Sequence, residues 1–350
     1  MSVLYDIHGL AVRITGLSRA AVPDINAKLH WFTVPDDGRR ADIEVALGDF
    51  EPNLAGCLTL DRRYWARPGL IYVEESDKKL SWRAEVDGLD RPAGETLRIR
   101  FAHGPSNRRR MPWRLFPDLV LHLYVLWPIL EVELAARGLY LVHAGAVERD
   151  GRALIIPGRG GVNKTAVVAD LCRRGWRPMS DDFVLLRNRP GGGTLALAMP
   201  TSPRWFEFQL RHMEAEDLSL VNKLRLLAFL YHQEQVGVEF TRTAELHSVA
   251  LLQAVEGCTE PVAEPLALEA AAESVELNCR MERTSYVGHG YIIGRYLEAY
   301  RYVVPQSSWH RPWEGLGPAL AGMLRGTRMA RVSATPGYDR RLADVIESLA

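Results

Sequence analysis

The chain has 350 residues, of which 47% are hydrophobic and 25% are charged, a composition typical of a globular protein with one large domain or two ordinary ones. Its 43 basic residues balance its 43 acidic residues, so no overall field draws it to nucleic acid or to an anionic membrane. Arg108, Arg109 and Arg110 form a local basic cluster, which we interpret as a solvated loop.

Cysteine usage and hydropathy exclude further classes of protein. The cysteines are Cys57, Cys172, Cys258 and Cys279. They form no C-x-x-C pair, which argues against a zinc site and a disulfide framework, so we expect reduced, mostly buried thiols in a cytoplasmic protein. The first ten residues lack the basic start and apolar run of a signal peptide. Residues 119–134 are strongly apolar, but Pro128, Glu131 and Glu133 interrupt them, which favours a buried helix over a membrane span.

The first hundred residues favour short strands. These strands are expected over residues 10–14, 43–47, 70–73 and 97–101, with a helix at 22–31 and a turn at 76–79. Residues 104–107 are rich in turn formers and precede the arginine cluster, so we place a domain boundary there. The sequence thus predicts a small N-terminal α+β module over residues 1–110 and a second domain over residues 111–350.

The second domain starts with a helix and then alternates strands and helices. A proline near the start and Gly138 just past the end define a helix over residues 117–137. Strands are expected at 140–147 and 153–156 around a turn at 149–151, then a helix at 165–174 that ends at Gly175, one strand at 177–186, and a hairpin back to 195–197. Beyond Pro203 we expect helices at 218–231, 265–273 and 290–300, a strand at 248–255, and a closing strand and helix over 329–349.

A phosphate-binding loop is the most informative motif. Residues 158–165 match G-x-x-x-x-G-K-S/T except at the second glycine, where Asn163 stands. In such a loop the backbone N–H groups and the N-terminus of the next helix point at an anion, while Lys164 adds a positive charge and the Thr165 hydroxyl reaches a metal ion. The predicted nucleotide-binding residues are Gly158, Arg159, Gly160, Gly161, Val162, Asn163, Lys164 and Thr165.

Asn163 is the departure from this motif. The glycine that it replaces lets the backbone approach a phosphate, and a side chain there risks a clash or a forbidden dihedral angle. Asparagine, however, tolerates a positive φ better than other residues with a side chain. The loop therefore either keeps its anion site with altered affinity or has lost it. Arg159 is an extra cation that could compensate by contacting a phosphate.

Four more side chains are candidates for the chemistry. Asp181 stands 17 positions after Lys164, with Asp182 beside it, and such carboxylates can hold Mg²⁺ or accept a proton from a hydroxyl. Adjacent residues of a continuous strand point to opposite faces, so the strand must bend or end there for both to act, and an acidic loop is the alternative. His143 is either a core histidine or a site residue. Arg204, a weaker candidate for a cation that stabilises the transition state, is otherwise a surface arginine.

In their order along the chain, these residues resemble the HPr kinase/phosphorylase family of P-loop proteins, which is similar to phosphoenolpyruvate (PEP) carboxykinase. The resemblance lies in a His-Ala-Gly-Ala strand, then GRALIIPGRGGVNKT, then WRPMSDDFVLL, with a short gap between loop and paired aspartates. It covers residues 138–186 and extends in part to the N-terminal module and to residues 331–350, but not to residues 210–318. The fold class that it implies is α/β, with a PEP carboxykinase-like P-loop core in which helices flank a central mixed sheet.

The resemblance also implies a function. Lys164 and Thr165 would bind phosphates and Mg²⁺, Asp181 and Asp182 would share metal binding and general-base work, and His143 would lie beside them. The expected activity is that of an ATP- and Mg²⁺-dependent kinase whose acceptor is a hydroxyl of a protein, a peptide or a small molecule.

Two alternatives stay open: a pseudo-kinase scaffold that has lost turnover at Asn163, and a protein that uses another phosphoryl donor or runs the reverse reaction. We expect neither nucleic acid nor a membrane as a partner, while assembly into homo-oligomers stays open.

Overall fold

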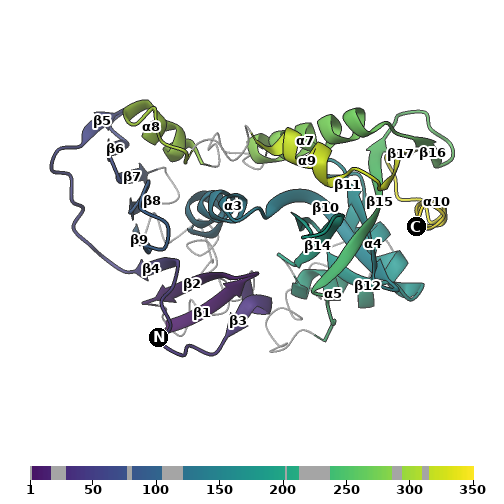
Figure 1. Ribbon diagram of the computed structural model, residues 1–350, viewed down its shortest axis with the longest axis horizontal. Helices are drawn as coiled ribbons and strands as arrows, with labels where there is room; N and C mark the ends of the chain where they lie inside the picture. Colours follow the sequence, from purple (N-terminus) through teal and green to yellow (C-terminus); the bar gives the residue numbers. More distant parts are fainter. Residues whose placement is uncertain are drawn as a thin grey trace, which may run out of the picture. The chain divides into compact units, whose positions relative to one another are not determined.

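A computed structural model of the chain describes residues 2–16, 29–76, 81–104, 121–201, 203–212, 237–285, 294–309 and 315–350. The chain folds into two compact units. The first unit comprises Met1–Ala136 and Tyr286–Pro312, and the second comprises Arg137–Ser285 and Trp313–Ala350 (Figure 1). The domain boundary predicted between residues 110 and 111 lies outside the described residues and stays a prediction.

Within its described residues, the first unit is built on a nine-stranded mixed sheet in the order β3-β1-β2-β4-β9-β8-β7-β6-β5. The pairs β2–β4 and β4–β9 are parallel, and the other neighbours are antiparallel. The strands are β1 (Ser2–Ile7), β2 (Leu10–Thr15), β3 (Thr33–Val34), β4 (Ile43–Leu47), β5 (Leu58–Leu60), β6 (Tyr64–Arg67), β7 (Leu70–Ser76), β8 (Ser81–Asp87) and β9 (Leu97–Gly104).

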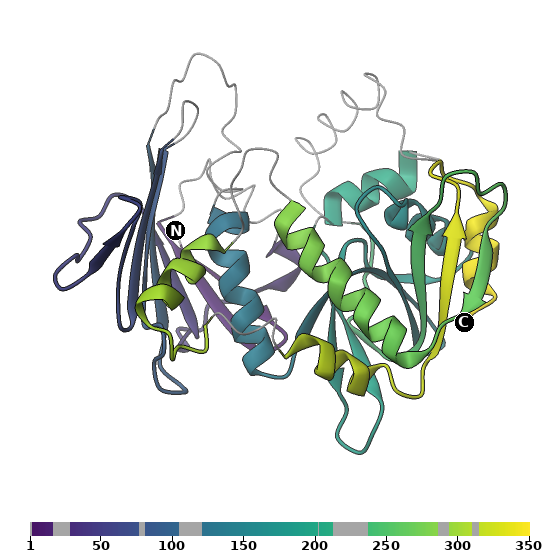
Figure 2. The same cartoon turned by 90° about the horizontal axis from the view of Figure 1, so that it is seen from above.

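One face of this sheet is apolar because its residues alternate with period two. Val73, Ala84 and Phe101 lie opposite one another on β7, β8 and β9, and all three are buried. The described helices of this unit are the 3-10 helix η1 (His30–Phe32), the π-helix η2 (Leu121–Leu126), α3 (Trp127–Ala136) and α8 (Arg295–Val303). Figure 2 shows α3 and α8 beside the sheet.

The local predictions for the first unit are confirmed where they can be compared. The four predicted strands correspond to β2, β4, β7 and β9. The helix predicted at 117–137 is described from Leu121, as η2 followed by α3, and Gly138 follows it with φ 70°. Among the described residues, no helix has both the length and the apolarity needed to cross a membrane. Residues 77–79 of the turn predicted at 76–79 and most of the helix predicted at 22–31 lie outside the described residues, as does the arginine cluster, while Ser76 is the last residue of β7.

The second unit has a mixed sheet in the order β11-β10-β13-β14-β15-β17-β16, with β12 paired to β10. The first residues of the long strand β15 pair with β14, and β15 is also parallel to both β11 and β17. Because β11 and β15 pair, the strands from β11 to β15 form a closed part of the sheet. The strands are β10 (Tyr140–Arg149), β11 (Arg152–Pro157), β12 (Arg177–Ser180), β13 (Phe183–Asn188), β14 (Thr194–Met199), β15 (Thr243–Ala254), β16 (Val262–Pro265) and β17 (Arg328–Ala334).

The described helices of the second unit are α4 (Lys164–Arg173), α5 (Pro203–His212), α7 (Leu268–Ser285), α9 (Leu316–Met323) and α10 (Arg341–Glu347). Helices α7 and α9 lie side by side (Figure 1). The predicted turn at 149–151 and the hairpin around the three glycines are confirmed, because positive φ angles at Asp150 and Gly151 suit a two-residue hairpin loop. The sequence did not predict α5, α9 or β16, and it placed the end of α7 too early. The helix predicted at 218–231 lies outside the described residues.

The cysteines require a correction. All four are free thiols, but only Cys279 is buried, while Cys57, Cys172 and Cys258 are partly exposed. The expectation of mostly buried thiols is therefore wrong, since cysteine's average preference for the interior does not decide individual positions. Desolvation nevertheless raises the pKa of the Cys172 thiol to about 12, against the opposing effect of Arg173.

A partly buried hydrogen-bond cluster attaches α8 to the turns of the first unit. The Tyr300 hydroxyl accepts the Gly69 N–H at 2.8 Å and donates to Asp90 Oδ2 at 2.7 Å. The Ser307 hydroxyl donates to the other Asp90 oxygen, Oδ1, at 2.7 Å. Burial, together with the bond to Asp90, raises the pKa of Tyr300, so its hydroxyl stays protonated and donates.

The variant Tyr300→Phe is expected to lower the free energy of unfolding of the first unit by about 0.5–1.5 kcal/mol, because it removes the hydrogen bonds of the Tyr300 hydroxyl with Gly69 and Asp90. Tyr302→Phe on the same helix is the matched control, since Tyr302 is 75% exposed. Urea denaturation followed by tryptophan fluorescence measures both variants. Equal denaturation midpoints for the two would contradict the role of the cluster.

Candidate functional site

The phosphate loop connects β11 to α4 and depends on glycine at two positions. Gly158 forms an isolated parallel bridge with Leu252, and an added Cβ would lie 2.8 Å from the Leu252 carbonyl oxygen. Gly161 has φ +83°, a conformation that favours glycine. The close approach to β15 and the left-handed turn therefore explain two of the loop's glycines without reference to a ligand.

Asn163 adopts the left-handed conformation, with φ 67° and ψ 25°. This confirms the expectation that asparagine can take the positive φ of the glycine it replaces. Its side-chain Nδ2 donates a hydrogen bond to the Pro336 carbonyl at 3.2 Å, and the residue is 8% exposed. The side chain thus binds the segment between β17 and α10 and does not cap α4.

Lys164 is the first residue of α4 and is 6% exposed. Its Nζ donates to the carbonyl oxygens of Gly158 at 2.9 Å and Arg159 at 3.0 Å, so the ammonium group spans the base of the loop. Thr165 follows and is partly exposed. A buried ammonium group beside a helix N-terminus that no side chain caps provides an electrostatic environment for an anion.

The two aspartates lie at a break between strands. The single strand predicted over residues 177–186 is a wrong expectation, because β12 ends at Ser180 and β13 begins at Phe183. The Ser180 hydroxyl accepts the N–H groups of Asp182 at 3.3 Å and Phe183 at 3.1 Å and donates to the Met199 carbonyl at 3.3 Å. Asp181 and Asp182 occupy the bend itself, so the alternation that separates neighbours in a continuous strand does not apply to them.

His143 on β10 contacts one of these aspartates. Its Nε2 lies 2.9 Å from Asp182 Oδ1, and the residue is 2% exposed. Asp182 is less buried, with a side chain that is 28% exposed, whereas Asp181 is 3% exposed. The predicted position of His143 beside the acids therefore agrees with the geometry for Asp182, while its role in catalysis stays a prediction.

Gly145, two residues along β10, brings the strand break and the loop together. An added Cβ there would lie 2.7 Å from Val168 Cγ2, 3.7 Å from the Asp181 carbonyl oxygen and 3.9 Å from Lys164 Cβ. The backbone of Asp181 and the start of α4 thus both lie close to a glycine that leaves no room for a methyl group. The loop lysine and the acidic bend are neighbours in space.

Helix α7 supplies residues that the sequence did not single out. Asn278 Nδ2 donates to the His143 carbonyl at 3.0 Å, and the His143 N–H donates to Cys279 Sγ at 3.4 Å. Glu282, one turn after Asn278, is 8% exposed, and its Oε2 lies 3.6 Å from His143 Nδ1 and 3.5 Å from Arg159 Nη1. Asn278 and Glu282 are four residues apart and therefore lie on the same face of a helix. The sequence contains this pattern, but the predicted helix ended at residue 273, before both of them.

The other predicted site residue is Arg204. It lies in the first turn of α5, but its side chain is outside the described residues, so its role stays a prediction.

The residues fit a nucleotide with magnesium in part. The described residues contain no group of three or more His, Cys, Asp or Glu side chains that could hold a metal ion. A magnesium ion on a triphosphate needs fewer protein ligands, because phosphate and water oxygens complete its octahedral shell. The buried Asp181 and the hydroxyl of Thr165, which follows the loop lysine, are the donor types that such an ion requires.

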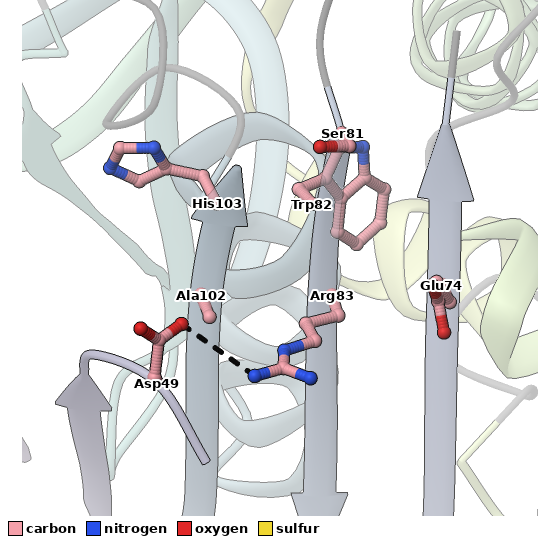
Figure 3. Close-up of a pocket in the computed structure, with 7 residues that line it drawn as sticks. All are labelled: Asp49, Glu74, Ser81, Trp82, Arg83, Ala102 and His103. Carbon is pink, nitrogen blue, oxygen red and sulfur yellow. Dashed lines mark ion pairs between the residues drawn. The ribbon is translucent and has the colours of Figure 1, made fainter. Parts of the chain in front are cut away.

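A separate hollow of about 180 Å³ lies on the sheet of the first unit (Figure 3). Its lining includes Trp82, Arg83 and His103 from β8 and β9. Arg83 Nη2 forms an ion pair with Asp49 Oδ1 at 3.6 Å. The Asp49 side chain is 97% exposed, so this pair contributes little to stability or binding. Burial lowers the pKa of His103, which favours its neutral form.

Comparisons with known proteins add little to this geometry. No family model matches the chain, and no curated protein matches it. Among solved structures, the HPr(Ser) kinase/phosphatase from Coxiella burnetii is similar over 60% of this chain and 92% of its own, with 12% identity and a TM-score of 0.26. Values this low do not establish a shared fold or function. The functional argument therefore rests on the site residues themselves.

The variant Gly145→Ala is expected to lower the free energy of unfolding by about 1–3 kcal/mol, because the new methyl group overpacks against Val168. Removing the Val168 side chain in Gly145→Ala/Val168→Ala should recover part of this loss. Gly322→Ala is the control, since a Cβ there meets nothing within 4 Å and helix α9 tolerates alanine. Urea denaturation measures all three, and a neutral Gly145→Ala would show that the strand and the helix are not in close contact.

Proposed function

We propose that the protein is an ATP- and Mg²⁺-dependent phosphotransferase that acts on a hydroxyl acceptor. The observation that carries the proposal is the close approach at Gly145, where the Asp181 backbone and Lys164 Cβ each lie within 4 Å of the same point. A cationic loop and a pair of carboxylates are the two parts that phosphoryl transfer needs side by side. An acidic bend with a structural role alone would not need to lie against the loop lysine.

In this proposal the loop binds the phosphates through its backbone. The N–H groups at the start of α4 and the Lys164 ammonium group face the anion, and Lys164 exchanges its bonds to the Gly158 and Arg159 carbonyls for bonds to phosphate oxygens. The left-handed Asn163 keeps the turn that the motif requires. Thr165 and Asp181 would hold Mg²⁺, which neutralises charge on the phosphates when it is bound.

Asp182 is the proposed general base. It is the more exposed of the two aspartates, and His143 contacts its Oδ1, so the carboxylate is held at the bend where it would accept the proton of the acceptor hydroxyl. The acceptor oxygen then forms a bond to the γ-phosphorus as the bond from that phosphorus to the bridging oxygen breaks, and ADP leaves with that oxygen. The acceptor is a protein, a peptide or a small molecule with a free hydroxyl.

The alternative is a pseudo-kinase that binds a nucleotide or a peptide without turnover. Its support is the replacement of the second glycine by Asn163. The left-handed backbone at Asn163 and the bond from its side chain to Pro336 weaken this alternative, because they remove the steric reason for an inactive loop. Substitution of Asn163 distinguishes an active kinase from a pseudo-kinase.

The variant Lys164→Met is expected to weaken ATP binding in the presence of Mg²⁺ by about tenfold or more, because it removes a buried charge-assisted contact of about 1.5–3 kcal/mol. Calorimetric titration with and without Mg²⁺ measures this change. Arg328→Met is the matched control, since Arg328 is exposed at the start of β17. Val332 on the same strand pairs with Leu252, and Leu252 forms the bridge to Gly158 of the loop. Equal affinity of wild type and Lys164→Met for ATP would contradict the proposal.

The variant Asn163→Gly tests the alternative. In an active kinase, phosphotransfer is expected to stay the same or to fall, because glycine keeps the turn but loses the bond to Pro336, which is worth about 1 kcal/mol. In a scaffold whose loop is blocked by the asparagine, nucleotide affinity would rise instead. Titration with ATP, together with a phosphate-transfer assay, distinguishes these results.

A further inference from the structure

One carboxylate oxygen in the second unit lies between the phosphate loop and the candidate base. Glu282 Oε2 is 3.5 Å from Arg159 Nη1 and 3.6 Å from His143 Nδ1. The other oxygen, Oε1, is 3.8 Å from the point where a Cβ of Gly160 would lie, so the carboxylate is also against the loop backbone. Glu282 therefore touches the first two residues after Gly158 and the imidazole that holds Asp182.

The burial of Glu282 makes this position costly for a bound anion. The residue is 8% exposed, and a carboxylate with so little water interacts strongly with neighbouring charges. A phosphate at the loop would be repelled by Glu282 and attracted by Arg159, whose side chain is 37% exposed. Glu282 and the phosphate therefore compete for the same guanidinium group.

We infer that Glu282 is a positioning residue that holds Arg159 before a nucleotide binds and orients the His143 imidazole toward Asp182. This inference rests on the proposed function, because it assigns the competing anion as a phosphate of the nucleotide. When a phosphate takes Arg159, Glu282 keeps its contact with His143. Binding at the loop and orientation of the base are thereby coupled through one side chain.

This coupling predicts that one substitution raises the nucleotide affinity and lowers kcat. Glu282→Gln removes the charge that competes for Arg159, so nucleotide affinity should rise by about threefold to tenfold. The same change removes the charge facing His143 Nδ1, so kcat should fall by about tenfold to a hundredfold. A residue with a purely structural role would not tighten binding while it slowed turnover.

The fold should survive this change because other contacts hold α7 against β10. The Asn278 amide donates to the His143 carbonyl at 3.0 Å, and Cys279 Sγ accepts the His143 N–H at 3.4 Å. Glutamine also keeps the volume of glutamate. The urea midpoint of Glu282→Gln is therefore expected to lie close to that of wild type.

The experiment compares wild type, Glu282→Gln, Arg159→Gln and the double variant. Calorimetry gives the affinity for a non-hydrolysable ATP analogue with Mg²⁺, and a transfer assay gives kcat and KM. Arg159→Gln should weaken binding, and Glu282→Gln should no longer strengthen it in the Arg159→Gln background. Glu276→Gln is the matched control, because Glu276 lies on the same helix and pairs with Arg280 instead. It should change neither value.

A third readout needs no nucleotide. The ¹⁵N chemical shifts of the His143 ring should change in ligand-free Glu282→Gln and not in Glu276→Gln. Weaker analogue binding by Glu282→Gln, or an unchanged His143 resonance, overturns the inference. Failure of wild type to bind any nucleotide overturns the proposed function instead, while the His143 readout still decides whether Glu282 orients the imidazole.

Discussion

The candidate site depends on the interruption of one strand at Asp181 and Asp182. Strand β10 pairs with β12 over Ala146–Glu148 and with β13 over Tyr140–His143, so the bend lies opposite the middle of a long, unbroken partner. The Ala144 N–H donates to the Asp182 carbonyl at 2.9 Å and the Ser180 hydroxyl takes two further N–H groups, which satisfies the backbone where the ladder is broken. Without the break, His143 could not meet Asp182 while Asp181 lay beside the loop.

Features set by local chemistry could be predicted from the sequence, and features set by distant pairing could not. The loop, its helix and the positive φ of Asn163 follow from glycine and asparagine preferences within eight residues. The bend at Asp181 does not, because residues 177–186 contain no glycine that would mark a turn, and only the separate pairings with β10 reveal two strands. Glu282 was missed for the same reason: its contacts with Arg159 and His143 join segments more than 120 residues apart.

Asn163 is compatible with a functional loop on physical grounds. A glycine at this position leaves the unfolded chain more freedom, so a residue that adopts the native turn without strain reduces the entropy lost on folding. Asparagine carries a modest penalty for its left-handed conformation and gains the bond from Nδ2 to the Pro336 carbonyl. Compared with glycine, asparagine at this position attaches the loop to the segment before α10. Asparagine therefore restricts the loop and, because its amide is neutral, adds no charge near the phosphate site.

The balance of charge around the loop favours a ligand that brings its own cation. Lys164 and Arg159 supply two positive charges, whereas Asp181, Asp182 and Glu282 supply three carboxylates in the same neighbourhood. A bare triphosphate would add negative charge to a region that already has an excess, and burial of Asp181 and Glu282 strengthens the repulsion. A divalent cation reverses this sign, since it binds the phosphates and is attracted by the acids. Under the proposed function, these acidic residues would hold the divalent cation that accompanies the phosphates.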